Sequence, residues 1–193
     1  MRDSLTASYN RRYLDQRLDD LLAAESAGTG IAVVLVDLDF FKQINDMHGH
    51  PLGDQVLQQV VDVLQAGLPD GAFCARYGGE EFVLVLPDIT DAEAVAVCEA
   101  VRKQVEHYPW ERLARGLCVT VSLGVAHDAP VGSETRNSGV SELLLSADGL
   151  LYEAKQSGRN AVAYRSADGV ALAGSAARRR AQPCGPAVGS DSR

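Results

Sequence analysis

The sequence predicts an α/β (α+β) fold in which helices pack on a mixed β-sheet. Segments with the apolar pattern of strands and segments with the apolar pattern of helices alternate irregularly along the 193 residues. In addition, two short apolar runs flank the pair Gly78-Gly79. This arrangement is typical of a β-hairpin and therefore predicts an antiparallel strand pair within the sheet.

The strands are predicted from continuous apolar runs. Residues 31–36 include no polar side chain, which indicates a central strand buried on both faces. The hairpin covers residues 72–87 and ends at a proline. Two further strands are expected at residues 117–125, which are rich in β-branched side chains, and at residues 160–164.

The helices are predicted from apolar residues at helical spacing. Thr90 and Glu93 form a capping-box pattern at the start of one of them, and Gly158 suits the left-handed position that follows the end of another. The expected helices are residues 9–27, a helix that opens at Gly53 and Asp54, a helix that opens at Thr90, and residues 140–155.

The composition excludes several classes of function. The net charge of −8 argues against a nucleic-acid partner, which requires a basic face. No apolar run approaches the roughly 20 residues of a membrane span, and the first residues lack the apolar core of a signal peptide. The cysteines have the spacing of neither a zinc site nor a disulfide framework, so reduced thiols in a cytoplasmic protein are expected. These cysteines are Cys74, Cys98, Cys118 and Cys184.

The patterned region ends before the sequence does. Residues 1–165 carry the apolar periodicity of one folded domain. Residues 166–193 are dominated by Ala, Gly, Ser, Arg and Pro without such periodicity. We therefore expect residues 166–193 to form a disordered tail.

Carboxylates stand at the ends of two predicted strands. Asp37 and Asp39 follow the buried run, and Glu80 and Glu81 lie at the hairpin turn. Strand ends open into the crevice where ligands bind, and carboxylates from two neighbouring elements suit Mg²⁺ together with phosphate oxygens. One of the two aspartates is expected to face this site while the other supports a loop or the core. The alternative is that the acids are solvated or paired with Arg76.

The segment after these aspartates carries a family resemblance. Residues 40–54, together with Asp37-Leu38-Asp39 and the hairpin sequence Gly78-Gly79-Glu80-Glu81-Phe82, closely resemble the GGDEF family of bacterial diguanylate cyclases, in its GGEEF form. Residues 2–12, 119–126 and 147–160 resemble further motifs of the same family in the same order. The resemblance extends over residues 2–164.

The resemblance implies a fold and a reaction. The fold is a palm-like, mainly antiparallel sheet of five strands surrounded by helices, as in nucleotidyl cyclases. The reaction condenses two GTP molecules into cyclic di-GMP with release of two pyrophosphates, in the bacterial cytoplasm. Since one domain holds one GTP, a homodimer of two half-sites is implied, controlled by a sensor domain or partner that this sequence does not include.

The resemblance also assigns the catalytic acids by position. Asp37, Glu80 and the backbone carbonyl of Leu38 match metal ligands for Mg²⁺, with Mn²⁺ as an alternative ion. Asp37, Glu80 and Glu81 are the expected catalytic residues. Glu81 matches a position that assists deprotonation or metal binding, and a structural role is the alternative.

The substrate contacts are assigned in the same way. Asn45 and Asp54 match the pair that reads guanine, because a carboxylate accepts hydrogen bonds from N1–H and the 2-amino group. A helix N-cap is the alternative for Asp54, and a neutral hydrogen-bonded ring is the alternative for His50. Phe40, Phe41 and Phe82 are expected in the core or a pocket wall. The other positions that match nucleotide or phosphate contacts are Lys42, His50, Gly78, Gly79, Lys155 and Arg159.

The sequence departs from the family at two places. Pro69 and Ala72 stand where many members have an inhibitory Arg-x-x-Asp, so product inhibition is expected only at the guanine pocket. Ala7-Ser8 stands where the opening motif has Gly-Leu. A catalytically silent nucleotide-binding module is the alternative function, and a cyclase that uses ATP is disfavoured by Asp54.

Overall fold

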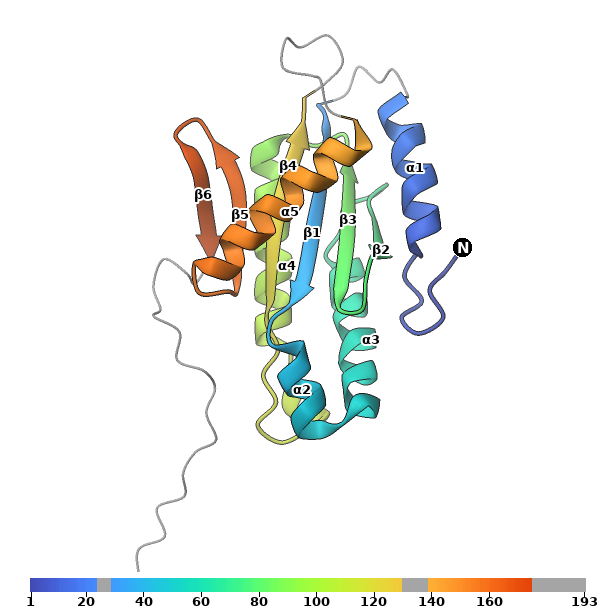
Figure 1. The fold of residues 1–193 in the computed structure, drawn as a ribbon, viewed down its shortest axis with the longest axis vertical. Coiled ribbons are helices and arrows are strands. Elements are labelled where there is room, and N and C mark those ends of the chain that lie inside the picture. Colours follow the sequence, from blue (N-terminus) through green and yellow to red (C-terminus); the bar gives the residue numbers. More distant parts are fainter. Residues whose placement is uncertain (24–28, 130–138, 175–193) are drawn as a thin grey trace, which may run out of the picture.

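The computed structural model describes residues 1–23, 29–129 and 139–174, which fold into a six-stranded sheet covered by helices (Figure 1). The strands are β1 (Ile31–Leu38), β2 (Phe73–Arg76), β3 (Glu81–Pro87), β4 (Val121–Asp128), β5 (Ala161–Ser166) and β6 (Gly169–Gly174). The helices are α1 (Arg11–Ala23), α2 (Phe41–His48), α3 (His50–Ala66), α4 (Asp91–His107) and α5 (Val140–Gln156), with a 3₁₀ turn at Trp110–Arg112. The predicted α/β class is therefore confirmed.

β1 occupies the centre of the sheet, whose strand order is β2-β3-β1-β4-β5-β6. All eight β1 residues are buried, as the uninterrupted apolar run predicts. β1 pairs antiparallel with β3 and with β4, and among the described strand pairs only β4 and β5 run parallel. The mixed, mainly antiparallel sheet is confirmed.

The sheet has one strand more than the five expected. β6 pairs antiparallel with β5 and lies at the edge of the sheet. It falls within residues 166–193, for which a disordered tail was expected, so that expectation is wrong for residues 169–174. Gly169 supplies the turn with φ 121°, a conformation that favours glycine. Residues 175–193 lie outside the described part of the chain.

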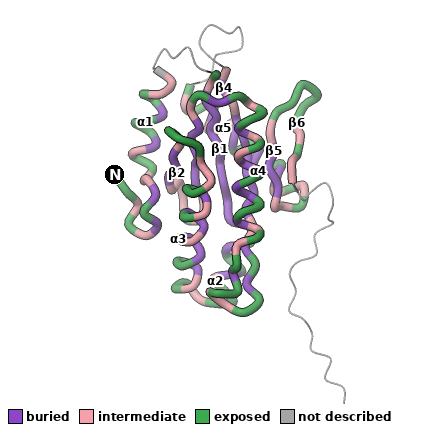
Figure 2. The backbone as a smooth tube through the Cα atoms, turned by 180° about the vertical axis from the view of Figure 1, so that it is seen from behind, coloured by how far each residue is buried: buried purple, intermediate pink, exposed green. Residues whose placement is uncertain are grey.

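Helices cover the two faces of the sheet in two layers. α5 and α1 lie on one face, where Val33 and Leu35 of β1 are buried. α3 and α4 lie on the other face, where Val34 and Val36 are buried. Successive side chains of a strand point to opposite faces. β1 therefore contributes to both cores, and the tube is buried along β1 and most of its neighbours β3 and β4, whereas the edge strand β6 has no buried residue (Figure 2).

The helix expected to open at Gly53 begins earlier, and a short helix precedes it. Phe40 takes a left-handed conformation (φ 57°) and starts α2, and Gly49 (φ 83°) separates α2 from α3. α3 then begins at His50. Asp54 lies one turn inside α3, so its alternative role as the N-cap is wrong. The sequence pattern missed α2, whose buried side chains are only Phe41 and Ile44.

Two helix ends form as predicted. At the start of α4, Thr90 Oγ1 accepts a hydrogen bond from Glu93 N (3.3 Å), and the Glu93 carboxylate accepts one from Thr90 N (3.0 Å). After the end of α5, Gly158 has φ 113°. These ends fix the lengths of the two helices that flank β4.

α5 packs directly against the backbone of β4. A side chain at Gly124 would overlap the carbonyl of Ala147 and the amide of Leu151. Glycine is therefore required at this position, because it allows the helix to approach the strand closely. This close packing places the C-terminal turn of α5 beside the end of β1. Along the described ranges, no helix is both long and apolar enough to cross a bilayer.

Candidate active site

An acidic cluster lies where the end of β1 meets the β2–β3 turn. Asp37 of β1 pairs with Glu81, the first residue of β3, in the strand register. Leu38 N donates a hydrogen bond to the Glu80 carbonyl (3.4 Å), which fastens the turn to the strand end. The structure thus brings together the four residues that the sequence assigned to metal binding and catalysis: Asp37, Leu38, Glu80 and Glu81.

The carboxylates of this cluster repel one another. Partial burial and the charges of Asp37 and Glu81 raise the pKa of Glu80 above its ordinary value, and Lys155 opposes this rise. A raised pKa means that the fold disfavours the charged form of Glu80. A cation between Glu80 and Asp37 would relieve this repulsion.

Lys155 supplies a positive charge next to Asp37. Lys155 Nζ lies 2.8 Å from Asp37 Oδ2, and the two side chains are 30% and 10% exposed. Lys155 stands on the last turn of α5, which the close packing on β4 brings to this position. A residue expected to contact phosphate is therefore within hydrogen-bond distance of a residue expected to bind metal.

Asp39 is the supporting member of the aspartate pair. Its Oδ1 accepts a hydrogen bond from Ser122 Oγ (2.7 Å), and its Oδ2 accepts from Thr120 Oγ1 (2.7 Å) and Asn160 N (3.0 Å). Burial raises the pKa of Asp39, although these three hydrogen bonds favour its charged form. Asp39 therefore joins the end of β1 to β4 and to the start of β5.

Arg76 binds the backbone of the hairpin turn next to the acidic cluster. Its guanidinium donates hydrogen bonds to the carbonyls of Gly78 (3.2 Å) and Gly79 (2.8 Å) and forms an ion pair with Asp3 (3.1 Å). The alternative in which Arg76 neutralises the cluster acids is not the observed arrangement. Sequence reasoning assigned no role to Asp3. A threonine three residues after Asp3 could have indicated a local turn at this aspartate. In the structure, Thr6 Oγ1 donates a hydrogen bond to Asp3 Oδ1 (2.8 Å).

The two glycines of the turn have different surroundings. A side chain at Gly78 would begin 2.5 Å from Glu81 Oε2, so Gly78 makes room for that carboxylate. At Gly79 a side chain would meet nothing within 4 Å. Gly79 therefore leaves the turn open to a ligand, whereas the space at Gly78 is used by the protein itself.

The residues expected to read guanine stand on consecutive helices, α2 and α3. Asn45 Oδ1 is buried and has no hydrogen-bond partner among the described residues. It packs against Gly53, where any side chain would overlap it. Asp54, the next residue, is exposed. A buried acceptor without a partner in the protein is uncommon, and either a water molecule or a donor from a ligand would satisfy it.

Lys42 and His50 lie at the surface of the same two helices. Lys42 therefore shares α2 with Asn45, and His50 shares α3 with Asp54. Neither of them has a hydrogen bond or an ion pair with Asp37 or Glu80 in the described part of the chain.

Arg159 lies over an exposed aromatic ring. Its guanidinium carbon is 4.5 Å from the centroid of Phe40, whose side chain is 48% exposed. Phe41 and Phe82 take core positions, whereas Phe40 is half-exposed, which leaves the pocket wall as its expected role. The interaction joins the turn after α5 to the junction between β1 and α2.

The donors of the acidic cluster suit a hard cation. They are carboxylate oxygens and a backbone carbonyl, which Mg²⁺ prefers. Over residues 1–23, 29–129 and 139–174, no group of three or more His, Cys, Asp or Glu side chains is arranged to hold a metal ion. Two carboxylates leave coordination positions for water and phosphate. The residues present therefore fit a magnesium ion that completes its coordination with water or phosphate oxygens.

Comparisons with known proteins agree with this arrangement. The family model described as diguanylate cyclase, GGDEF domain, matches residues 1–161. The response regulator PleD of Caulobacter vibrioides is 40% identical over 169 residues, which are 86% of this chain and 36% of PleD. This chain spans between 35% and 45% of the length of curated relatives such as PleD.

Solved structures share the fold. The GGDEF domain of DgcB from Caulobacter crescentus, in complex with c-di-GMP, is 35% identical with a TM-score of 0.74, covering 84% of this chain and 94% of that one. Diguanylate cyclase SiaD of Pseudomonas aeruginosa, in complex with its activator SiaC, is 34% identical with a TM-score of 0.74, covering 84% of this chain and 61% of that one. Because the family model extends from the opening segment to the first residue of β5, the chain belongs to the GGDEF domain family of diguanylate cyclases.

Proposed function

We propose that this domain is a diguanylate cyclase, which condenses two GTP molecules into cyclic di-GMP and releases two pyrophosphates. One observation carries the proposal. Asp37 of β1 and Glu80 of the β2–β3 turn interact electrostatically at the end of β1, with Lys155 Nζ 2.8 Å from Asp37 Oδ2. Carboxylates and an ammonium at one point suit a triphosphate that carries a divalent cation.

Asp37, Glu80 and the Leu38 carbonyl would hold the cation, with phosphate oxygens as its remaining ligands. Mg²⁺, or Mn²⁺ in its place, supplies neutralisation of the triphosphate charge and a lower pKa for the attacking hydroxyl when it is bound. When the nucleotide binds, the ammonium of Lys155 would leave Asp37 and pair with a phosphate oxygen instead. Arg159, on the turn that follows α5, binds the same triphosphate.

Each half-reaction forms one bond and breaks one. The ribose 3′-oxygen of one GTP forms a bond to the α-phosphorus of the other, and the bond from that phosphorus to the oxygen bridging it to the β-phosphate breaks. Pyrophosphate leaves with the electron pair. Glu81 is the proposed acceptor of the proton of the 3′-hydroxyl, a role supported by its pairing with Asp37 in the sheet register.

α2 and α3 select the base. The Asp54 carboxylate accepts hydrogen bonds from N1–H and the 2-amino group of guanine, a donor pattern that adenine lacks. Asn45 Oδ1, buried without a partner among the described residues, receives a donor from the same base. Lys42 and His50 border this pocket from the surface, and Gly79 gives the nucleotide access to the hairpin backbone.

The site is half of a catalytic unit, because one domain holds one GTP and the reaction consumes two. A homodimer therefore has to place two sites face to face. A sensor domain or a partner protein is proposed to control this pairing, as SiaD was solved with an activator. The substrate assigns the domain to the cytoplasm, where GTP is available. Pro69 and Ala72 replace the charged pair of an inhibitory site, so the product competes with GTP at the guanine pocket.

The proposal is tested by incubating the full chain with GTP and Mg²⁺ and identifying the products by chromatography and mass spectrometry. We expect cyclic di-GMP and pyrophosphate in a ratio of one to two, with a rate that rises faster than linearly with protein concentration. Glu80→Ala should make no product. A chain that binds 3′-deoxy-GTP, which cannot condense, and makes no product even as a forced dimer would be a silent nucleotide-binding module.

A further inference from the structure

A buried ionic network lies beside the candidate site and plays no part in the steps above. Arg102 of α4 is 2% exposed. It donates to Glu99 through Nε (2.7 Å) and Nη2 (2.9 Å), and through Nη1 to Glu106 (2.8 Å) and Asn160 Oδ1 (2.5 Å). Gly174, at the end of β6, covers it, and a side chain there would begin 2.8 Å from Arg102 Nε.

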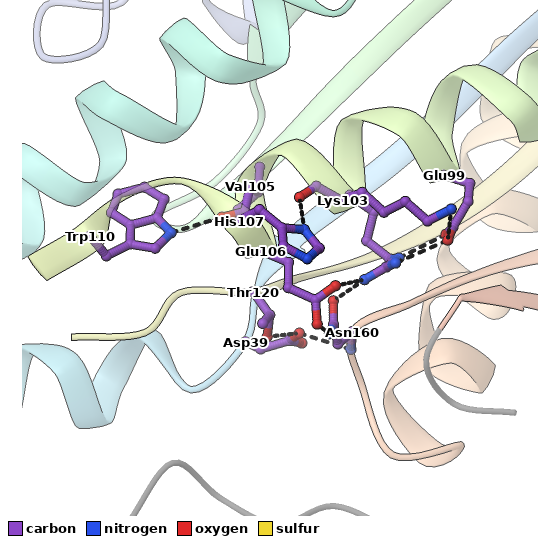
Figure 3. A network of polar contacts seen from close by, with 10 residues as sticks. Asp39, Glu99, Lys103, Val105, Glu106, His107, Trp110, Thr120 and Asn160 are labelled. Carbon is purple, nitrogen blue, oxygen red and sulfur yellow. Dashed lines mark hydrogen bonds and ion pairs between the residues drawn. The ribbon is translucent and has the colours of Figure 1, made fainter. Parts of the chain in front are cut away.

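Asn160 is the member of this network that lies outside α4, directly before β5. Its side-chain Nδ2 donates to Glu106 Oε1 (2.9 Å) and its backbone N donates to Asp39 Oδ2 (3.0 Å). Figure 3 shows Asn160 between Glu106 and Asp39, with hydrogen bonds to both. Since α4 and α5 cover opposite faces of the sheet, Asn160 connects α4 to the turn after α5 and to the end of β1.

The turn that Asn160 terminates is held in an unfavourable conformation. Gly158, Arg159 and Asn160 all have positive φ, at 113°, 65° and 48°. The left-handed region is unfavourable for residues other than glycine, and asparagine tolerates it best. Such a turn persists only where its surroundings determine it, and the bonds of Asn160 provide these surroundings.

Arg159 stands directly before Asn160, and its guanidinium lies over the ring of Phe40, at the junction between β1 and α2. Asp39 and Phe40 are consecutive, as are Arg159 and Asn160, and the two pairs are joined twice: Asn160 N to Asp39 (3.0 Å), and Arg159 over the Phe40 ring (4.5 Å). We infer that Asn160, held by Arg102 and Glu106, is a positioning residue that keeps Arg159 aimed at the bound triphosphate. This inference rests on the proposed function.

A double-mutant cycle separates this role from a structural one. Asn160→Gly keeps the left-handed conformation and the bond to Asp39 but removes the contacts with α4. Binding of 3′-deoxy-GTP with Mg²⁺ is measured by calorimetry on the full chain. We expect Asn160→Gly and Arg159→Ala each to weaken binding about tenfold, as for the loss of a charged contact. The double variant should bind as Arg159→Ala does.

Two further variants complete the design. Thr90→Ala removes the capping box at the far end of α4 and should lower the midpoint of thermal unfolding without changing nucleotide affinity. Glu106→Gln is a milder change in the network and serves the same cycle if Asn160→Gly does not fold. Glu106→Gln should weaken nucleotide binding about threefold in the wild-type chain. In a chain that already carries Arg159→Ala, it should not weaken binding further.

The outcomes are distinct. Independent effects, with the double variant weakened about a hundredfold, would overturn the inference and leave the proposed function standing, as would full affinity in Asn160→Gly. A wild-type chain that neither binds 3′-deoxy-GTP nor makes cyclic di-GMP would overturn the proposed function and the inference with it.

Discussion

Lys155 Nζ lies 2.8 Å from Asp37 Oδ2, so the last turn of α5 neutralises the acid at the end of β1. This ammonium lies beside the carboxylate that the proposed function assigns to a metal ion. Lys155 and a metal ion therefore compete for the carboxylate, whereas a nucleotide phosphate offers Lys155 another partner. On the proposed function, we therefore expect the site to favour metal and nucleotide together over metal alone.

The first prediction concerns this competition. In Lys155→Met, Asp37 loses its partner, so the affinity for Mg²⁺ alone should rise about two- to fivefold, as expected for a partly exposed ion pair. The affinity for 3′-deoxy-GTP with Mg²⁺ should fall, because a phosphate contact is lost. Titration calorimetry measures both. Lys103→Met, which removes an exposed lysine paired with Glu99 on α4, should change neither. A lower Mg²⁺ affinity in Lys155→Met would contradict the competition.

The second prediction concerns pH. The pKa of Glu80 is raised in the fold, by burial first and then by Asp37 and Glu81. Between the ordinary glutamate pKa and this higher value, the folded chain binds more protons than the unfolded chain, so stability falls as pH rises through that window. Glu80→Gln should therefore stabilise the metal-free fold at pH 7, by less than about 1 kcal/mol, while abolishing turnover. The gain should vanish below about pH 4, where the glutamate is protonated in both states.

Urea unfolding in the presence of a chelator, at several pH values, checks this prediction. Glu93→Gln is the control with the opposite sign, because hydrogen bonds with Thr90 lower the pKa of Glu93. That variant should lose stability at neutral pH. A Glu80→Gln variant that is less stable than wild type at pH 7 would show that the acidic cluster is not strained without a cation.

The third prediction concerns the packing of α5 on β4. A methyl group at Gly124 would overlap the backbone of α5, so Gly124→Ala should destabilise the fold by about 1–3 kcal/mol and displace Lys155 from Asp37. Gly149→Ala places the same methyl group within α5, where nothing lies within 4 Å, and should stabilise by about 0.5–1 kcal/mol. Thermal unfolding and turnover of both variants test this. Equal effects of the two substitutions would be incompatible with the observed packing.

The fourth prediction follows from the departure at the opening motif. Ala7 has φ 57° at the position where the family sequence has glycine. Because the left-handed region costs about 1–2 kcal/mol for a residue with a Cβ atom, Ala7→Gly should stabilise the chain by about 1 kcal/mol. Ala92→Gly, the same change within α4, should destabilise by about the same amount. If both lower the unfolding midpoint, the left-handed turn at Ala7 is not strained.

Local patterns were sufficient for the centre of the sheet. The apolar run of β1 predicts a buried strand because every side chain in it lies in a core, and the acids at its end follow from that placement. The hairpin and the capping box of Thr90 are also local, since their partners lie at most twelve residues apart in the sequence. Asp37 and Glu80 were therefore accessible from the sequence alone.

The features that the sequence did not predict depend on contacts between residues that are distant in the sequence or too few to form a periodic pattern. α2 begins at a left-handed Phe40 and buries only Phe41 and Ile44, which is too few for a periodic signal. β6 has no buried residue and pairs with β5, so its formation depends on a partner strand. The bond from Arg102 to Asn160 spans 58 residues, so only the folded chain reveals that a helix on one face of the sheet supports a turn on the other.

The most direct measurement is the position of a metal ion in crystals of the full chain grown with 3′-deoxy-GTP and Mn²⁺, located by its anomalous scattering. We expect a peak between the carboxylates of Asp37 and Glu80, against the triphosphate, with Lys155 turned from Asp37 to a phosphate oxygen. A bound nucleotide without a peak at this position, and with Asp37 still paired with Lys155, would contradict the account.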